Sequence, residues 1–331
     1  MDLIQLLQTL EKQHPLKWDR KFNTSVIDMK VEDGRAMLEI PGRDSLLAIS
    51  KPCHQQIAER LDIPVKYYNR MEAEAPHLLA GNVNAWLTRM EKDVFIRGLG
   101  NAVRAFLSDR YRVIDHLDFL YCSLNELQAN RAEIEECYLS ETEMYVKVRS
   151  HHLKDFIRHR DDLIIGGLLL TNSETGHKAL RVEPRIFRVQ CTNGMVIEKL
   201  TTRQVHLGNG NGGNGELDDD MVYLAIRRSI RELFGRFGEI VQSLRDSTEI
   251  KIGNPQWVIN NLVKHYGLSE AQKENILMAF GSEPEPDAYG IANAVTKAAQ
   301  KEESWEGSLE LEKIGGRLLS LPAQEFKAFD G

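Results

Sequence analysis

Residues 93–108 have the pattern of a strand, a glycine turn and a second strand, and they constrain the fold more than any other part of the sequence. A glycine turn between two strand-like runs predicts a β-hairpin. The segment that follows is polar up to Asp115, which precedes a helical pattern and therefore predicts a helix N-cap. A chain with this sequence has to place at least one antiparallel strand pair beside helices.

Further strand patterns occur on both sides of this hairpin. Residues 25–40 alternate between apolar and polar side chains around Asp33-Gly34, which is a strong hairpin signal. Residues 134–150 look like another hairpin, and residues 162–171 and 177–191 are two more strand-like runs joined by a turn. Pro184 lies inside the last run, and because proline cannot donate a ladder hydrogen bond it predicts a sheet edge or a bulge.

Helical patterns dominate both ends of the chain. Apolar side chains recur at helical spacing in residues 2–13 and 76–90. The predicted buried face of the second helix is Leu78, Leu79, Val83, Trp86 and Leu87. A long helix is predicted at 219–246 because apolar residues recur there at alternating steps of four and three. Shorter helices are predicted at 254–266, 269–280, 287–302 and 306–320.

We therefore expect an α+β fold. A mixed, mainly antiparallel sheet built from residues 93–200 would pack against helices from both ends of the chain, with a helical C-terminal subdomain. The Gly/Asn-rich run at 206–218 offers few side chains to bury and predicts a loop between a core domain, 1–205, and a helical region, 219–331. The apolar seam of the long helix would be buried within the subunit or against a second copy, and we expect a homo-oligomer.

Charge and composition limit the possible partners. The 331 residues carry a formal net charge of -7, so nucleic-acid binding would depend on a local basic patch. No apolar run reaches the roughly 20 residues that span a bilayer, and the first residues lack the pattern of a signal peptide. Four cysteines lie far apart: Cys53, Cys122, Cys137 and Cys191. We expect reduced thiols in a cytoplasmic protein without membrane contact.

Positive charge is concentrated around the 93–108 hairpin. Arg97, Arg104, Arg110 and Arg112 lie close in sequence to the aromatic Tyr111. Guanidinium groups pair with phosphates and aromatic rings stack on unpaired bases, so this composition suits single-stranded nucleic acid. These five residues are candidate nucleic-acid contacts.

A second group of candidates is on the strand-like run at 177–191. Arg181, Arg185 and Arg188 would line one ridge of the strand if Pro184 shifts its register. The alternative for both groups is that the arginines are solvated or paired with the many nearby carboxylates, which is common for charged residues on a strand.

Signals for catalysis and metal binding are weak. Asp109 and Asp115, with Asp118, have the residue type needed by a Mg²⁺-dependent nuclease, but a turn residue and a helix cap explain the first two more simply. A group with metal-ligand chemistry comprises His151, His152, His159, Asp155, Asp161 and Asp162. The sequence contains no phosphate-binding loop and no common zinc motif. We predict no catalytic residues, no metal and no cofactor.

Three stretches of the sequence resemble a known family. Residues 101–112 (NAVRAFLSDRYR), followed by Ile114-Asp115, resemble the central block of the family catalogued as domain of unknown function 932, or phage/plasmid-like proteins. The turn NSETG within 171–194 with RVQCTNGM at 188–195, and NAVT at 293–296, resemble two further blocks in the same order. The resemblance spans about residues 60–300.

The resemblance implies a protein of phages, plasmids or integrated elements that handles single-stranded DNA. Together with the local charge, it predicts a non-catalytic single-stranded DNA-binding protein, such as a recombination or annealing mediator. The first alternative is a protein-interaction factor that acts on a host system. The second is a Mg²⁺-dependent nuclease that uses Asp109 and Asp115.

Overall fold

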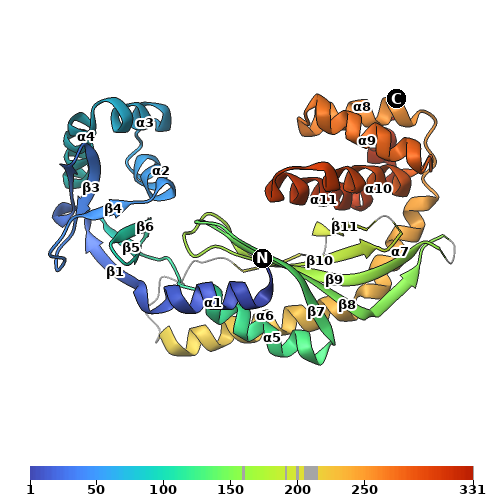
Figure 1. Ribbon diagram of the computed structural model, residues 1–331, viewed down its shortest axis with the longest axis horizontal. Helices are drawn as coiled ribbons and strands as arrows, with labels where there is room; N and C mark the ends of the chain where they lie inside the picture. The colour runs from blue at the N-terminus through green and yellow to red at the C-terminus, as the bar shows by residue number, and fades with distance from the viewer. Residues whose placement is uncertain (159–160, 191, 199–200, 205–214, 331) are drawn as a thin grey trace.

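The computed structural model describes residues 1–331 except 159–160, 191, 199–200, 205–214 and 331. The chain forms two β-sheets and helices that cover them, which confirms the α+β class. In outline the molecule is a broad U (Figure 1). An N-terminal arm and a helical C-terminal arm rise on the same side of a base that contains the second sheet. Cys191, His159 and most of the predicted 206–218 loop lie outside the described residues.

The first sheet forms the N-terminal arm. Its strand order is β1-β5-β6-β4-β3-β2, and it is mixed because β4 pairs in parallel with β6. The strands are β1 (Lys17–Asn23), β2 (Asp28–Glu32), β3 (Arg35–Glu39), β4 (Leu47–Ile49), β5 (Asp93–Leu99) and β6 (Ala102–Ser108). Both hairpins that were predicted in this part of the chain are confirmed, since β2 pairs with β3 and β5 pairs with β6. Asp33 and Gly34 have φ of 49° and 74°, the left-handed conformation that an Asp-Gly turn requires.

Three helices cover one face of this sheet and complete a separate hydrophobic core. They are α2 (Lys51–Arg60), α3 (Val65–Glu74) and α4 (Pro76–Met90). The apolar cluster they form with the strands contains buried residues only between Ile27 and Phe106. The arm is therefore a unit with its own hydrophobic core. The chain enters this unit at β1 and leaves it after β6.

The predicted buried face of α4 is wrong at two positions. Leu79, Val83 and Leu87 are buried, whereas Leu78 is 55% exposed and Trp86 is 44% exposed. At 100° per residue, Leu79, Val83 and Leu87 fall within one 80° sector, and Leu78 and Trp86 fall outside it. The helix has more apolar residues than its buried face can hold.

The second sheet forms the base and is antiparallel throughout, with the strand order β11-β10-β9-β8-β7 and β12 paired to β10. Its strands are β7 (Ala132–Leu139), β8 (Met144–Phe156), β9 (Leu163–Asn172), β10 (Leu180–Arg188), β11 (Asn193–Val196) and β12 (Thr202–Gln204). The expectation of one sheet from 93–200 is therefore wrong. The 93–108 hairpin instead pairs with β1, a strand that the sequence patterns did not predict.

Pro184 occupies a position of β10 at which the neighbouring strand changes. Residues 180–182 pair with β12 and residues 185–188 pair with β11, so Pro184 falls between the two ladders. Proline fits at this position because neither β11 nor β12 needs a hydrogen bond from the backbone N–H of residue 184.

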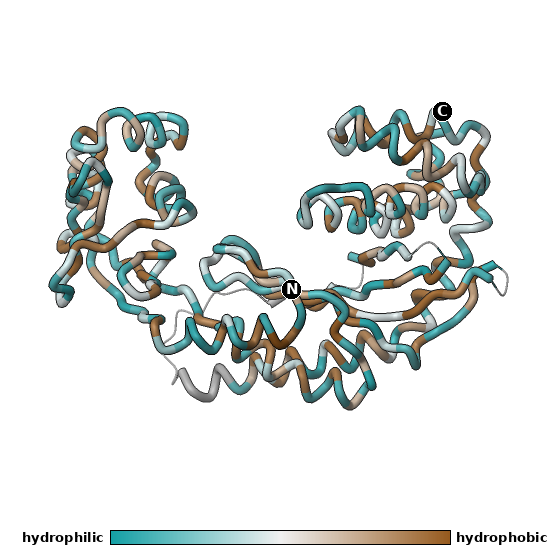
Figure 2. Tube along the Cα trace, viewed as in Figure 1, coloured by the Kyte–Doolittle hydropathy of each residue, from teal (hydrophilic) through white to brown (hydrophobic). Residues whose placement is uncertain are grey.

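Helices from distant parts of the chain cover the base: α1 (Leu3–Gln13), α5 (His116–Ala129) and α6 (Gly215–Gly235). Figure 2 shows the hydrophobic stretches along α1 and along the strands of the second sheet. The predicted long helix is interrupted, because α6 ends at Gly235 and α7 (Phe237–Thr248) begins after Arg236. Most of its predicted seam is buried inside the subunit: Ile226, Ile230, Leu233, Ile240 and Leu244.

The C-terminal arm is the predicted helical subdomain. Its helices are α8 (Pro255–Tyr266), α9 (Glu270–Ser282), α10 (Ala288–Ala298), α11 (Trp305–Ser320) and α12 (Ala323–Lys327). Their core continues into the second sheet through residues such as Ile164, Ile186 and Met195. In the described parts of the chain, no helix is both long enough and apolar enough to cross a membrane.

A fragment of residues 15–110 should fold on its own, because the core of the N-terminal arm is complete within it. We expect strand and helix signals in circular dichroism and one cooperative urea transition, at lower urea than in the full chain. A fragment of residues 35–130, which lacks β1 and β2, is the control. The absence of a cooperative transition for 15–110 would contradict a separate core.

Candidate functional site

The eight predicted contact residues do not form one surface. Arg97, Arg104 and Tyr111 turn inward to the joint between the two sheets, where they meet the connection between β9 and β10. Arg185 and Arg188 are buried beneath the C-terminal arm. Of the eight residues only Arg110 is exposed to solvent, while Arg112 and Arg181 are partly buried.

The guanidinium of Arg97 donates hydrogen bonds to three other residues. Arg97 is 4% exposed, and its Nε and Nη2 donate to the two carboxylate oxygens of Asp19 at 2.9 and 3.0 Å. Nη2 also donates to Asp115 at 2.6 Å, and Nη1 donates to the carbonyl of Glu174 at 2.9 Å. Burial opposes the charge, but these carboxylates outweigh burial and raise the pKa of the guanidinium. Arg97 therefore uses four of its five N–H donors inside the protein.

Glu174 is the centre of this joint. Glu174 is 1% exposed. Its carboxylate accepts hydrogen bonds from Lys17 at 2.5 Å, from Arg104 at 3.0 Å and from the backbone N–H of His116 at 2.7 Å. Burial alone would raise the pKa of this carboxyl, but the surrounding positive groups hold the pKa well below its ordinary value. We call Lys17, Arg97, Arg104, Asp115 and Glu174 the joint cluster.

Tyr111 extends the joint cluster. Its hydroxyl donates to the carbonyls of Ser173 and Glu174, both at 3.2 Å, and its ring lies against Phe95 with centroids 6.1 Å apart. Gly176 has a φ of +77°, and a Cβ there would lie 2.7 Å from Leu107, so glycine lets the connection pack on the first sheet. The Tyr111 ring is not available to stack on a base.

His116 is a neutral histidine inside the joint. It is 1% exposed, and burial lowers its pKa to about 4. The side-chain N–H of Asn172 faces its Nδ1 at 3.1 Å, so Nδ1 accepts and Nε2 carries the proton. Among the described residues, Nε2 has no hydrogen-bond partner.

Segments that resemble the family meet in space. The stretch 101–115 supplies Arg104, Tyr111 and Asp115, and the NSETG turn supplies Glu174. Asn193 of the CTNG stretch donates to Thr296 of the NAVT stretch, which is a second long-range pairing of the same kind. These residues hold parts of the fold together.

The arginines of β10 are also paired. Arg185 donates twice to Glu312 of α11, at 3.0 Å in each case, and to Glu135 at 2.7 Å. Arg188 pairs with Asp162 at 2.5 Å and with Glu283 at 2.7 Å. The sequence left open the alternative that these arginines pair with carboxylates. Arg185 and Arg188 both do so.

The nuclease and metal alternatives find little support in the geometry. Asp115 is the N-cap residue of α5 as predicted, but its carboxylate pairs with Arg97 and lies 3.7 Å from Lys17. His151 faces Glu133 and His152 faces Arg131. Within the described parts of the chain, no group of three or more His, Cys, Asp or Glu residues could hold a metal ion.

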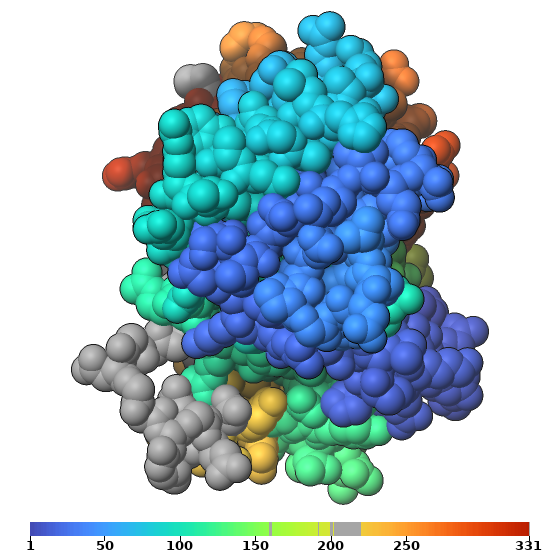
Figure 3. Space-filling view, turned by 90° about the vertical axis from the view of Figure 1, so that its left-hand side faces the viewer, coloured from blue at the N-terminus to red at the C-terminus, as the bar shows by residue number. Residues whose placement is uncertain are grey.

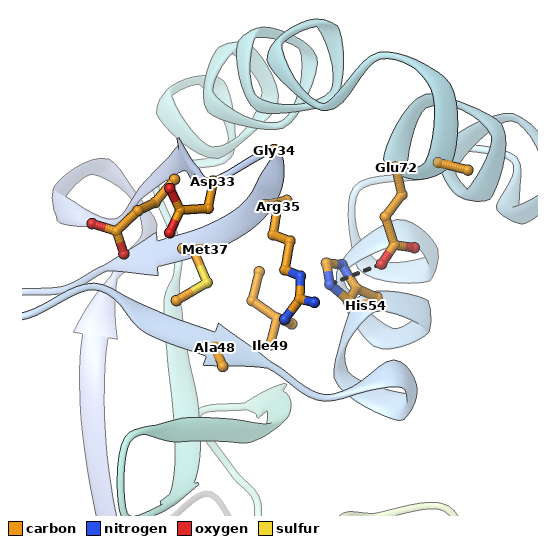
Figure 4. A pocket seen from close by; sticks show the side chains of 11 residues that line it. Asp33, Gly34, Arg35, Met37, Ala48, Ile49, His54 and Glu72 are labelled. Carbon is orange, nitrogen blue, oxygen red and sulfur yellow. Dashed lines mark ion pairs between the residues drawn. The ribbon is translucent and has the colours of Figure 1, made fainter.

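The sequence patterns did not predict a pocket of about 770 Å³ in the N-terminal arm (Figure 4). Its walls are the β2–β3 hairpin, β4 and the facing ends of α2 and α3. The lining residues are Glu32, Asp33, Gly34, Arg35, Ala36, Met37, Ala48, Ile49, His54, Glu72 and Ala73. The Asp-Gly hairpin was predicted, but nothing in the sequence indicated that it faces α2 and α3.

His54 links the two helices at the wall of this pocket. Tyr68 lies 2.9 Å from its Nδ1, and Glu72, one turn further along α3, lies 3.2 Å from its Nε2. Burial lowers the pKa of His54 to about 4, so the ring is neutral at pH 7. Burial also raises the pKa of the Glu72 carboxyl, against the effect of Lys51. The negative charge of Glu72 is therefore not compensated by His54.

Comparison with known proteins identifies no relative of this chain. The chain matches no family model, no curated protein and no solved structure. The resemblance to the phage/plasmid-like family therefore stays a prediction.

Substitution Glu174→Gln should strongly destabilise the protein, because it leaves Lys17 and Arg104 buried without their carboxylate. We expect a loss of about 3–5 kcal/mol in the free energy of unfolding at pH 7, measured by urea denaturation. The exposed Glu141→Gln is the control, with an expected change of no more than about 0.5 kcal/mol. Equal stability of Glu174→Gln and the native protein would show that the joint cluster is not needed.

Stability should fall between pH 7 and pH 5. The unfolded chain protonates His116 near pH 6.5, whereas the folded protein does so only near pH 4, so acid favours unfolding in this window. His116 alone should contribute a fall of about 2 kcal/mol, measured by urea denaturation at both pH values. His116→Gln should reduce the slope, and the exposed His151→Gln should keep it. An unchanged slope in His116→Gln would contradict the assignment.

Proposed function

We propose that the protein is a non-catalytic protein-interaction factor that docks a partner on the outer side of its N-terminal arm. The observation that carries the proposal is the exposed face of α4. It presents the exposed Leu78, Ala85, Trp86 and Arg89 around the half-buried Asn82, and we call these five residues the α4 stripe. Figure 3 shows the arm from its outer side.

The α4 stripe has the composition of an interface centre. Trp86 is 44% exposed, and the guanidinium of Arg89 lies 5.5 Å from the centroid of its ring. Tryptophan and arginine are the residue types that most often dominate binding energy at protein interfaces. The spacing of the stripe places its residues within about 100° of the helix circumference. Leu78, Trp86 and Arg89 can therefore contact one partner surface together.

The charges around the α4 stripe indicate the chemistry of the partner. Helix α4 contains no aspartate or glutamate, although the whole chain has a net charge of -7. Arg89 is accordingly free of a competing carboxylate on its own helix. The partner that fits is a protein with an apolar surface and a carboxylate opposite Arg89.

Single-stranded nucleic acid is the second candidate. The exposed Arg110 next to the joint favours it, together with the resemblance to a family suspected of handling single-stranded DNA. The pairing of Arg97, Arg104, Arg185 and Arg188 with carboxylates weighs against it, because these groups would have to break internal ion pairs to reach a phosphate. The prediction that the protein belongs to a phage or plasmid depends on the family resemblance alone.

Affinity capture with matched variants tests the proposal. Tagged native protein, Trp86→Ala, Arg89→Ala and the control Trp257→Ala, whose ring is 51% exposed on α8, are incubated with extract of cells that naturally contain the protein. We expect a partner that the native protein and Trp257→Ala retain, that Trp86→Ala loses, and that Arg89→Ala binds at least tenfold more weakly. A partner retained equally by all four would overturn the proposal.

The competing functions are measured on the same samples. Sedimentation of the native protein and of Trp86→Ala over a range of concentrations shows whether a second copy binds through the α4 stripe. Anisotropy with a labelled single-stranded oligonucleotide, at low and moderate salt, shows whether nucleic acid binds. Salt-sensitive binding that Arg110→Ala weakens and Trp86→Ala does not would favour the nucleic-acid function.

A further inference from the structure

The pocket in the N-terminal arm carries opposite charges on facing walls. Arg35 reaches into it from β3, and Figure 4 shows its guanidinium directed toward His54. Glu72 points into the same space from α3, on the helical side. In the described part of the chain no acidic group is within 4 Å of Arg35, and His54 is the only basic partner within 4 Å of Glu72. Within this part of the chain, an arginine without a carboxylate partner and a glutamate beside a neutral histidine thus border one cavity.

His54 lies between these two charges, and apolar side chains line other parts of the pocket. Met37 from β3, Ala48 and Ile49 from β4, and Ala73 from α3 line the pocket. Buried His54 fixes the orientation of the Glu72 carboxylate, because its other ring nitrogen is held by Tyr68 at 2.9 Å. A few fixed polar groups around an apolar surface are typical of small-molecule sites.

We propose that this pocket binds a free α-amino acid with an apolar side chain. Its carboxylate pairs with Arg35, its ammonium group pairs with Glu72, and its side chain packs on Met37 and Ile49. Glu32 and Asp33, which also line the pocket, disfavour a ligand that is purely anionic. Arg35 disfavours a ligand that is purely cationic. A zwitterion satisfies both walls, because charge-assisted hydrogen bonds form at each end. The proposal is independent of the α4 stripe.

Calorimetric titration of the full chain at pH 7 tests the proposal with three matched probes. L-Leucine has both charges, isoamylamine has only the ammonium group, and 4-methylpentanoate has only the carboxylate. We expect leucine to bind at least tenfold more tightly than either single-charge probe, since each charged hydrogen bond is worth at least that factor. No heat from leucine at 10 mM, or equal binding of a single-charge probe, would overturn the proposal.

Conservative variants assign the two ends of the ligand. Arg35→Gln should weaken leucine at least tenfold without weakening isoamylamine, and Glu72→Gln should weaken leucine without weakening 4-methylpentanoate. Glu74→Gln and Arg70→Gln are the controls, because this ion pair lies on the exposed side of α3, outside the pocket. Equal loss in the controls would overturn the assignment. If Glu72→Gln unfolds, Ala73→Met fills the pocket without a change of charge and should abolish leucine binding.

Discussion

The carboxylate of Glu174 is the contact on which the arrangement of the two sheets depends. A charge with 1% exposure is costly unless cations compensate for it, and Lys17 and Arg104 do so from two strands of the other sheet. Arg97 and Asp115 complete the same network. Arg97 and Arg104 pair with carboxylates there, so two of the four arginines in the most basic stretch of the sequence serve the joint, while Arg110 is exposed. The composition of this stretch resembles that of a nucleic-acid surface, but Arg97 and Arg104 hold the N-terminal arm to the base.

Local signals predicted those parts of the fold that depend on short stretches of chain. Turn residues, caps and periodicity predicted the α+β class, the three hairpins, the start of α5 at Asp115 and the C-terminal helices. The division into two sheets could not be predicted, because it depends on β1 pairing with β5 more than 60 residues away. The partners of the arginines are equally remote in sequence: Arg185 finds Glu312, 127 residues further on.

The candidate site illustrates the same limit. A helical period shows that α4 has an apolar face, but not which of its many apolar residues belong to it, so Leu78 and Trp86 were assigned to the core. The pocket is harder still to predict, since Arg35, His54 and Glu72 come from three elements. Each of these residues is ordinary in its own segment. Only their convergence gives them a common chemistry.

The N-terminal arm is an insertion into the base, and this has a consequence for the order of folding during synthesis. Helix α1 precedes the arm but packs with α5 and β7, and the amino group of Met1 donates to the carbonyl of Cys137, 136 residues away. On the ribosome the arm can therefore close its core while α1 still has no partner. The apolar side of α1, with Leu6 and Leu10, stays uncovered until α5 and β7 emerge.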